Sequence, residues 1–132
     1  MRRQWEEIDA WNAQSLDALI CPATATAAPQ HDATADFTPT AVYTTRYNIL
    51  NLPAGVAPCT TVRSDEMDRA ERKDRLDKRA VEIQRGSAGL PIGVQVVGRP
   101  YREDVVLAVM QRIEEDARGR GEVPRTPIDP RG

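Results

Sequence analysis

The stretch GSAGLPIGVQVVG, residues 86–98, decides the fold of this chain. Its second part, residues 90–98, is a short apolar run that is typical of a buried β-strand. Gly93 and Gly98 interrupt the run, and glycine inside a strand indicates a bend or a close approach of neighbouring backbone. Gln95 lies in the middle and needs hydrogen-bond partners if the strand is buried. The stretch therefore predicts a strand in a crowded sheet and raises the question of what packs against it.

Helical and strand patterns alternate on both sides of this stretch. Helices are predicted where apolar residues recur three or four positions apart, and strands where short apolar runs meet prolines. The predicted helices are residues 2–15, 42–50 and 103–117, and the further predicted strands are residues 16–23 and 52–62. This mixture predicts an α/β fold in which helices cover a sheet.

Each of these helices has a recognisable periodic face, and in the first one Trp5, Ile8, Trp11 and Ser15 recur at helical spacing. The second is expected to pack through Val42, Tyr43, Arg46, Tyr47 and Leu50, and the last through Val106, Val109, Met110, Ile113 and Ala117.

Three segments have the composition of connections rather than of core elements. Residues 24–40 are small, polar and contain prolines, which predicts a loop. Residues 63–88 mix charges of both signs, which predicts a solvated helix or a mobile insertion. Residues 119–132 contain three prolines and are expected to form an extended or disordered tail. We therefore assign residues 1–118 to one α/β unit that carries the charged insertion.

Composition excludes several classes of protein. The net charge of −2 and the pI of about 5.4 argue against a nucleic-acid partner, which would need a basic face. No run approaches the ~20 apolar residues of a membrane-spanning helix. The first residues lack the apolar region of a secretory signal, so we expect Cys21 and Cys59 to be free thiols in the cytoplasm.

The residues alone show no active site. The single histidine, His31, lies in a polar loop beside Asp32, where an exposed side chain is expected. One histidine and two distant cysteines do not make a metal cage. The glycine spacing matches neither a dinucleotide-binding nor a phosphate-binding loop, and no serine lies in a GxSxG turn.

Three segments in a fixed order resemble the C-terminal part of the amidase-signature family. They are LDALICPA (16–23), NILNLPAGVAP (48–58) and GLPIGVQVVGRPYREDVVLAVMQRIEE (89–115). The motif residues that carry the resemblance are Asn48, Pro53, Ala54, Gly89, Pro91, Gly93, Gln95 and Gly98. Within the family, the run from Tyr43 to Val62 and the charged insertion after it are most similar to the fatty-acid amide hydrolase branch. Asn51 stands where most amidases have glycine, and that branch accepts a polar residue there.

The resemblance implies a fold and a chemistry. The fold is a mixed β-sheet core flanked by helices. The chemistry is hydrolysis of amide bonds by a Ser–cis-Ser–Lys triad, with no cofactor and no metal. In the family these residues lie in the N-terminal and central parts. The chain has no Gly-Gly-Ser-Ser-Gly motif, and its lysines, Lys73 and Lys78, both lie in the charged insertion. We therefore assign no catalytic residue and expect the chain alone to be inactive.

The resemblance also implies roles for individual residues. In the fatty-acid amide hydrolase branch, the helix before the Asn48 motif lines the acyl channel, which points to Thr38, Ala41 and Thr45 as channel residues. Gln95 is expected to be a structural support whose partners lie largely in the part of the enzyme that carries the nucleophile. The implied partners are a small-molecule amide and that missing N-terminal part.

Two alternatives stay open at this point. The chain could belong to a general amidase or to the amidase subunit of a tRNA-dependent amidotransferase. It could instead be a non-catalytic module that binds a partner through its strand edges, and such edges favour self-association. A cytoplasmic location, with or without peripheral contact to a membrane, fits each of them.

Overall fold

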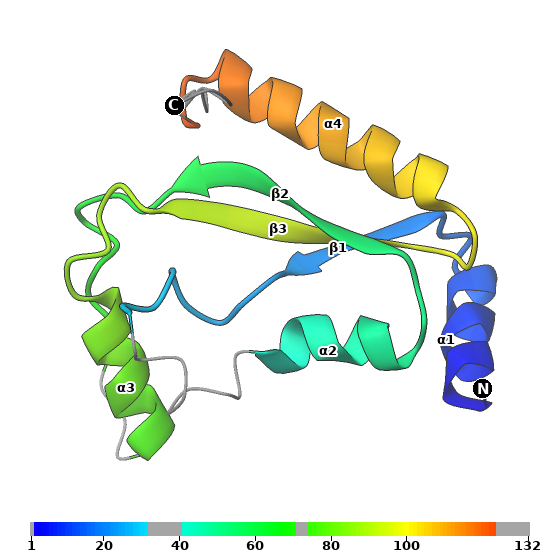
Figure 1. Cartoon of the computed structure of the whole chain (residues 1–132), viewed down its shortest axis with the longest axis horizontal. Helices are drawn as coiled ribbons and strands as arrows, with labels where there is room; N and C mark the ends of the chain where they lie inside the picture. Colours follow the sequence, from blue (N-terminus) through cyan, green and yellow to red (C-terminus); the bar gives the residue numbers. More distant parts are fainter. Residues whose placement is uncertain (1, 32–40, 71–73, 124–132) are drawn as a thin grey trace, which may run out of the picture.

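The computed structural model describes residues 2–31, 41–70 and 74–123 (Figure 1). The elements are α1 (Arg2–Ala13), β1 (Ala18–Pro22), α2 (Val42–Ile49), β2 (Ala54–Thr61), α3 (Arg75–Gln84), β3 (Pro91–Gly98) and α4 (Glu103–Gly119). Their order and type confirm the predicted α/β fold, and α3 corresponds to the first of the two alternatives for the charged insertion, a solvated helix or a mobile segment.

The stretch that was singled out in the sequence forms the central strand of the sheet. The strand order is β1-β3-β2, and β3 is antiparallel to both neighbours. In this register Gln95 lies beside Cys21 on one side and Val56 on the other. Val96 and Val97 of β3 are 0% exposed, as expected for a strand with neighbours on both edges and both faces.

One face of the sheet is covered by α4, which packs along β2 and β3 (Figure 1). Val106 and Ala117, two residues of its predicted packing face, are buried there. Val109, Met110 and Ile113 of the same face are half-buried. The apolar period of this helix therefore located its packing face correctly.

The opposite face carries α1 and α2. Trp11 of α1, Tyr47 of α2, Leu52 and Val97 form a buried cluster between them and the sheet. The guanidinium group of Arg99 donates two hydrogen bonds to the backbone carbonyl of Leu16, at 2.9 and 2.6 Å. It also contacts the Asn12 side chain, so the end of α1 is tied to the turn that follows β3.

The predicted packing face of α2 is only partly correct. Tyr47 is buried and Leu50 is half-buried, but Val42 is 64% exposed and Tyr43 is 41% exposed. The reason is that α2 contacts the sheet only through residues in its second half. The predicted face, from Val42 to Leu50, is longer than this contact. The apolar pattern predicted the helix correctly but assigned too many of its residues to the contact with the sheet.

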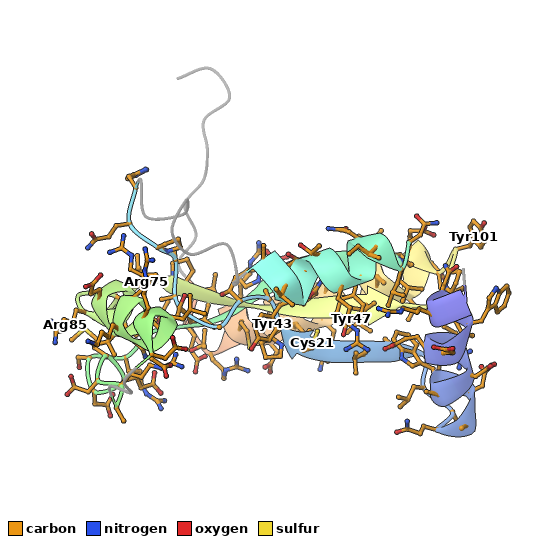
Figure 2. The ribbon with its side chains drawn as sticks, turned by 90° about the horizontal axis from the view of Figure 1, so that it is seen from below. Cys21, Tyr43, Tyr47, Arg75, Arg85 and Tyr101 are labelled. Atoms are coloured by element: carbon orange, nitrogen blue, oxygen red, sulfur yellow. The ribbon has the colours of Figure 1, made fainter. Side chains whose placement is uncertain are left out.

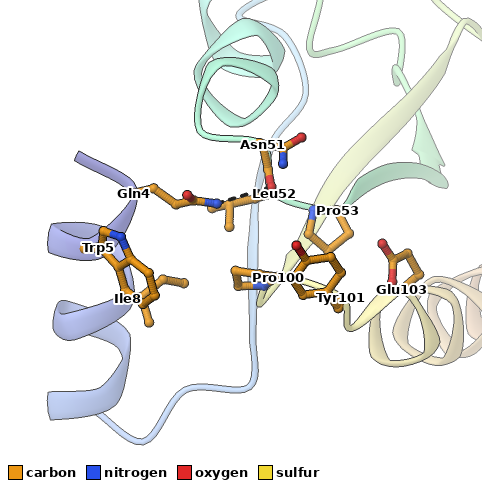
Figure 3. A pocket seen from close by; sticks show the side chains of 9 residues that line it. All are labelled: Gln4, Trp5, Ile8, Asn51, Leu52, Pro53, Pro100, Tyr101 and Glu103. Carbon is orange, nitrogen blue, oxygen red and sulfur yellow. Dashed lines mark hydrogen bonds between the residues drawn. The ribbon is translucent and has the colours of Figure 1, made fainter. Parts of the chain in front are cut away.

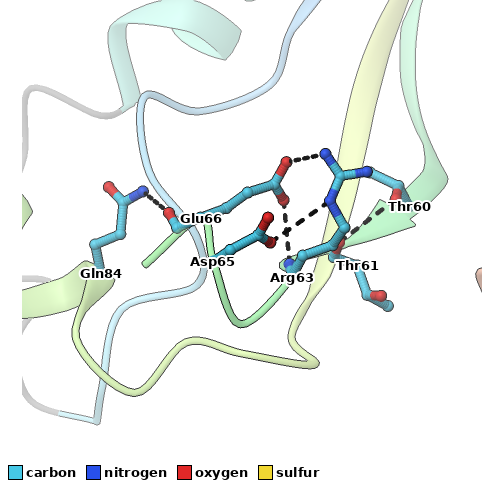
Figure 4. A network of polar contacts seen from close by, with 6 residues as sticks. All are labelled: Thr60, Thr61, Arg63, Asp65, Glu66 and Gln84. Atoms are coloured by element: carbon cyan, nitrogen blue, oxygen red, sulfur yellow. Dashed lines mark hydrogen bonds and ion pairs between the residues drawn. The ribbon is translucent and has the colours of Figure 1, made fainter. Parts of the chain in front are cut away.

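The charged insertion is held by polar contacts close to the sheet (Figure 4). Arg63 pairs with Glu66 at 2.6 Å, and its backbone N–H donates to the same carboxylate at 3.1 Å. The amide of Gln84, at the end of α3, donates to the carbonyl of Glu66 at 2.9 Å. These contacts connect α3 to the end of β2, and Ala80 and Ile83 are the residues of α3 that are buried.

Among the described helices, none has the length and apolar character that a membrane-spanning segment needs.

Candidate functional site

Helix α2 presents an apolar face that no described residue covers. Ala41, Val42, Thr45 and Ile49 lie on one side of the helix, since positions three or four apart share a face. All four are exposed, and Ile49 and Val42 reach 77% and 64%. We call these four residues the outer face of α2.

Two of the three expected channel residues belong to this outer face. Ala41 is the residue before the first turn, and Thr45 follows one turn later. Thr38, the third, lies outside the described residues. The structure thus places Ala41 and Thr45 together on an open surface, opposite the side on which Tyr47 packs.

Beneath α2, three polar side chains from three elements form a chain of contacts, of which Figure 2 labels Cys21 and Tyr47. The thiol of Cys21 lies 3.8 Å from the hydroxyl oxygen of Tyr47 and 3.8 Å from Oε1 of Gln95. Gln95 is 3% exposed. Its carbonyl therefore has one partner among the described residues, and the expectation that its partners lie largely in the nucleophile-carrying part stays a prediction. Sequence reasoning missed this pairing because Cys21 and Gln95 meet only through the register of β1 and β3.

The burial of Tyr47 in this chain of contacts makes the fold less stable at alkaline pH. Burial, and then the hydrogen bond with Cys21, raise the pKa of Tyr47 from 10.0 to about 12. As pH rises, the unfolded chain therefore ionises its tyrosine first, and stability that is fully present below pH ~10 is lost. We expect the free energy of unfolding to fall by up to about 2 kcal/mol as pH passes from about 10 to about 12.

Urea unfolding over this pH range measures the effect. Tyr47→Phe should remove most of the slope, whereas Tyr43→Phe, at an exposed position on the same helix, should keep it. An unchanged slope in Tyr47→Phe would contradict the assignment.

The two cysteines are both free, and both are half-buried. His31 is exposed in its loop. Within the described residues, His, Cys, Asp and Glu side chains do not gather in groups of three that could hold a metal ion.

Comparison with known proteins identifies the family. The family model described as "Amidase" matches residues 1–107. The chain belongs to the amidase family. It is 35% identical to Fatty acid amide hydrolase 1 of Caenorhabditis elegans, over 91% of this chain and 23% of that protein. It is 34% identical to Fatty-acid amide hydrolase 1 of Sus scrofa, over 81% of this chain and 19% of that protein.

A solved structure supports the fold of this amidase chain. A fatty acid amide hydrolase superposes with a TM-score of 0.63 at 19% identity, covering 85% of this chain and 21% of that chain. The amidase chain thus spans 19–23% of the length of these relatives. The family that was inferred from three short motifs is confirmed.

The amidase motif residues organise the ends of the strands. The carbonyl of Asn48 accepts the N–H of Asn51 at 3.0 Å and closes the turn after α2. The carbonyl of Pro53 accepts the N–H of Gly98 at 2.9 Å, directly before Ala54 opens β2. These two hydrogen bonds connect the turn after α2 and the start of β2 to the end of β3.

Two glycines of the segment at residues 89–98 are required for different structural reasons. Gly89 has a φ of +81°, a conformation that glycine adopts without strain, and its N–H donates to Val62 at 2.8 Å just before Pro91 opens β3. A Cβ on Gly93 would lie 2.6 Å from Val56 Cγ1 of the neighbouring strand. Gly93 therefore marks the close approach that the sequence predicted.

A hollow lies beside the first half of β3 in this amidase chain. The pairing of β1 with β3 stops at Val94, whereas β2 continues along β3 to Pro91. The hollow measures about 860 Å³ and is lined in part by residues 23–28. Thr26 in this loop is 9% exposed, and its hydroxyl has no hydrogen-bond partner in the described part of the chain. A buried hydroxyl without a partner is costly, so the hollow is a candidate contact surface for another segment.

Proposed function

We propose that this chain forms the C-terminal part of an amide hydrolase that acts on fatty-acid amides. Its outer face of α2 lines the channel for the acyl chain. The Ser–cis-Ser–Lys residues come from amidase sequence outside these 132 residues. The observation that carries the proposal is the uncovered apolar face at Ala41 and Thr45, in a chain whose matched relatives are named fatty acid amide hydrolases.

The chemistry of the outer face suits an acyl chain. Burial of each methylene group contributes about 0.8 kcal/mol, so an apolar wall binds long chains better than short ones. Ala41 and Thr45 are small, which leaves room beside the helix, while Val42 and Ile49 supply the apolar surface. Gln95, Cys21 and Tyr47 hold the helix from beneath, and we assign them a supporting role.

Further features of the chain bear on its proposed partners and its proposed location in the cell. The hollow beside β3, with the unpartnered hydroxyl of Thr26, is a place for the nucleophile-carrying part of the enzyme. Two free thiols fit the reducing cytoplasm. Fatty-acid amides partition into bilayers, so we also propose peripheral contact of the complete enzyme with a membrane. We propose no nucleic-acid partner.

Acyl-length preference tests the channel. In a complete enzyme that contains this chain, Ala41→Leu and Thr45→Leu are each expected to lower kcat/KM for a long-chain amide about tenfold, which corresponds to about 1.4 kcal/mol. The value for acetamide should stay the same, because a short substrate does not reach the added side chain. Thr44→Leu is the matched control, since it makes the same change on another side of α2.

Three outcomes would change the proposal. If both leucine variants keep the acyl-length preference, α2 does not line the channel. A complete enzyme that prefers acetamide in all variants is a general amidase. Turnover of either amide by the 132-residue chain alone would show that the catalytic residues lie in this chain after all.

A further inference from the structure

A pocket of about 620 Å³ lies at the end of the molecule where α1, the turn before β2 and the turn before α4 meet (Figure 3). Two aromatic rings, Trp5 and Tyr101, and two prolines, Pro53 and Pro100, line it, together with the buried Leu52 and the carboxylate of Glu103. Pro53 is also an amidase motif residue, whereas the outer face of α2 includes none of these side chains.

The two aromatic rings of this pocket are largely exposed to solvent. Trp5 is 63% exposed and Tyr101 is 89% exposed, and Tyr101 projects from the end of the molecule (Figure 2). Tryptophan and tyrosine provide large contact areas at a low cost in side-chain entropy, and for this reason they are frequent in binding surfaces.

The backbone at the pocket is held in an uncommon conformation. Asn51 has a φ of +51° and Tyr101 a φ of +61°, in the left-handed region that non-glycine residues rarely adopt. Only Ser15 shares this property among the other non-glycine residues that the structure describes. The side-chain amide of Gln4 donates to the carbonyl of Asn51 at 3.5 Å and connects α1 to this turn. Such backbone positions concentrate at ligand-binding sites, where they aim a side chain.

The sequence after α4 has the chemistry that such a pocket binds. Residues 124–130 read PRTPIDP, with a proline at every third position. A polyproline II helix has three residues per turn, so prolines with this spacing share one edge. Segments of this kind bind grooves that are lined by aromatic rings. Arg125, between the first two prolines, has a charge opposite to that of Glu103.

We propose that the pocket binds residues 124–130 of a second copy of this chain, with the prolines against Trp5 and Tyr101 and Arg125 beside Glu103. The proposal does not depend on the hydrolase function. Each copy has one pocket and one proline segment, so a reciprocal exchange closes a twofold dimer.

Distance favours the second copy over the same copy. The pocket lies at the first residue of α4, and the segment follows the other end of this 17-residue helix. At 1.5 Å per residue the helix spans about 25 Å. The N–H of Glu122 donates to the carbonyl of Ala117 at 3.1 Å, so the neighbouring Val123 lies at the last turn of α4. Pro127 lies four residues beyond Val123, a reach of only about 12–14 Å. The first two prolines therefore cannot return to the pocket of their own chain.

Tryptophan fluorescence of the full chain provides the test. The receptor is the 132-residue chain with Pro124, Pro127 and Pro130 replaced by alanine, which leaves its pocket empty. The probe is a synthetic peptide of residues 122–132, which contains no aromatic residue and is silent in emission. We expect a saturable change in emission that disappears in Trp5→Phe, because Trp11 is buried and does not meet the peptide.

Matched variants separate binding from folding. Tyr101→Gly removes the ring and keeps the left-handed backbone at lower strain, so the fold should persist while peptide affinity falls at least about tenfold. Tyr43→Ala, an exposed tyrosine away from the pocket, should bind as before. Glu103→Gln should weaken binding and reduce its dependence on salt.

Sedimentation equilibrium of the unsubstituted chain then tests the second copy. We expect a reversible dimer that becomes a monomer in Tyr101→Gly and in the triple alanine variant. Equal binding of a peptide with all three prolines replaced, or full affinity in Tyr101→Gly, would overturn the proposal. A chain that stays monomeric above the Kd of the peptide would overturn the exchange between copies.

Discussion

Trp11→Ala is expected to lower the free energy of unfolding by about 3–5 kcal/mol, the range for removal of a buried aromatic side chain. Trp11 is 3% exposed and belongs to the cluster with Tyr47, Leu52 and Val97 that joins α1 and α2 to the sheet. Domains of this size have a total stability of about 5–15 kcal/mol, so the variant should be close to unfolding at 37 °C. Urea denaturation followed by circular dichroism measures the change.

The same helix carries the control for this prediction. Trp5→Ala removes an identical side chain from α1, but Trp5 is 63% exposed. We expect it to change the unfolding free energy by less than about 1 kcal/mol. Comparable losses in the two variants would show that α1 does not pack on the sheet through Trp11.

Gly98→Ala is expected to cost about 2–3 kcal/mol, as overpacking does in a rigid environment. A Cβ at this position would lie 2.6 Å from Val106 Cγ2 and 3.1 Å from the carbonyl oxygen of Arg102. Val106 is β-branched and therefore stiff, and the carbonyl belongs to the backbone at the start of α4. Neither group can move without shifting α4 on the sheet. The midpoint of thermal unfolding should fall accordingly.

Gly55→Ala makes the same change on the neighbouring strand with a different neighbour. Its Cβ would meet the Sδ and Cε atoms at the flexible end of Met110. Methionine has several rotatable bonds and can swing aside, so we expect a loss below about 1 kcal/mol. A loss equal to that of Gly98→Ala would show that the space around Met110 is as rigid as that around Val106.

Local patterns were sufficient for most of the elements. Strand β3 was predicted from residues 90–98 and is observed from Pro91 to Gly98. Helix α4 was predicted from residue 103, where it begins. Both depend on interactions between residues close in sequence, which a linear pattern records. The depth to which α2 is buried was predicted less well, because it depends on how much of a face the sheet can reach.

The candidate site also contains some residues that the sequence predicted and others that only the structure revealed. Ala41 and Thr45 were identified through the amidase resemblance, and the prediction that they line a channel remains a proposal. That Ile49 and Val42 extend the same open face follows from the helix and its exposure. No local signal indicates the hydroxyl of Thr26, because its lack of a partner depends on where the loop leaves β3.

By itself, the sequence determined the family and the central strand. The glycines, the prolines and Gln95 of the motifs stand at fixed intervals. Each of these residues meets a requirement of the backbone at its own position. Only the tertiary structure decided that Cys21, Tyr47 and Gln95 contact one another in a row and that Trp5 and Tyr101 share a pocket. These residues are far apart in the sequence, and they meet because strand register and helix packing bring them together.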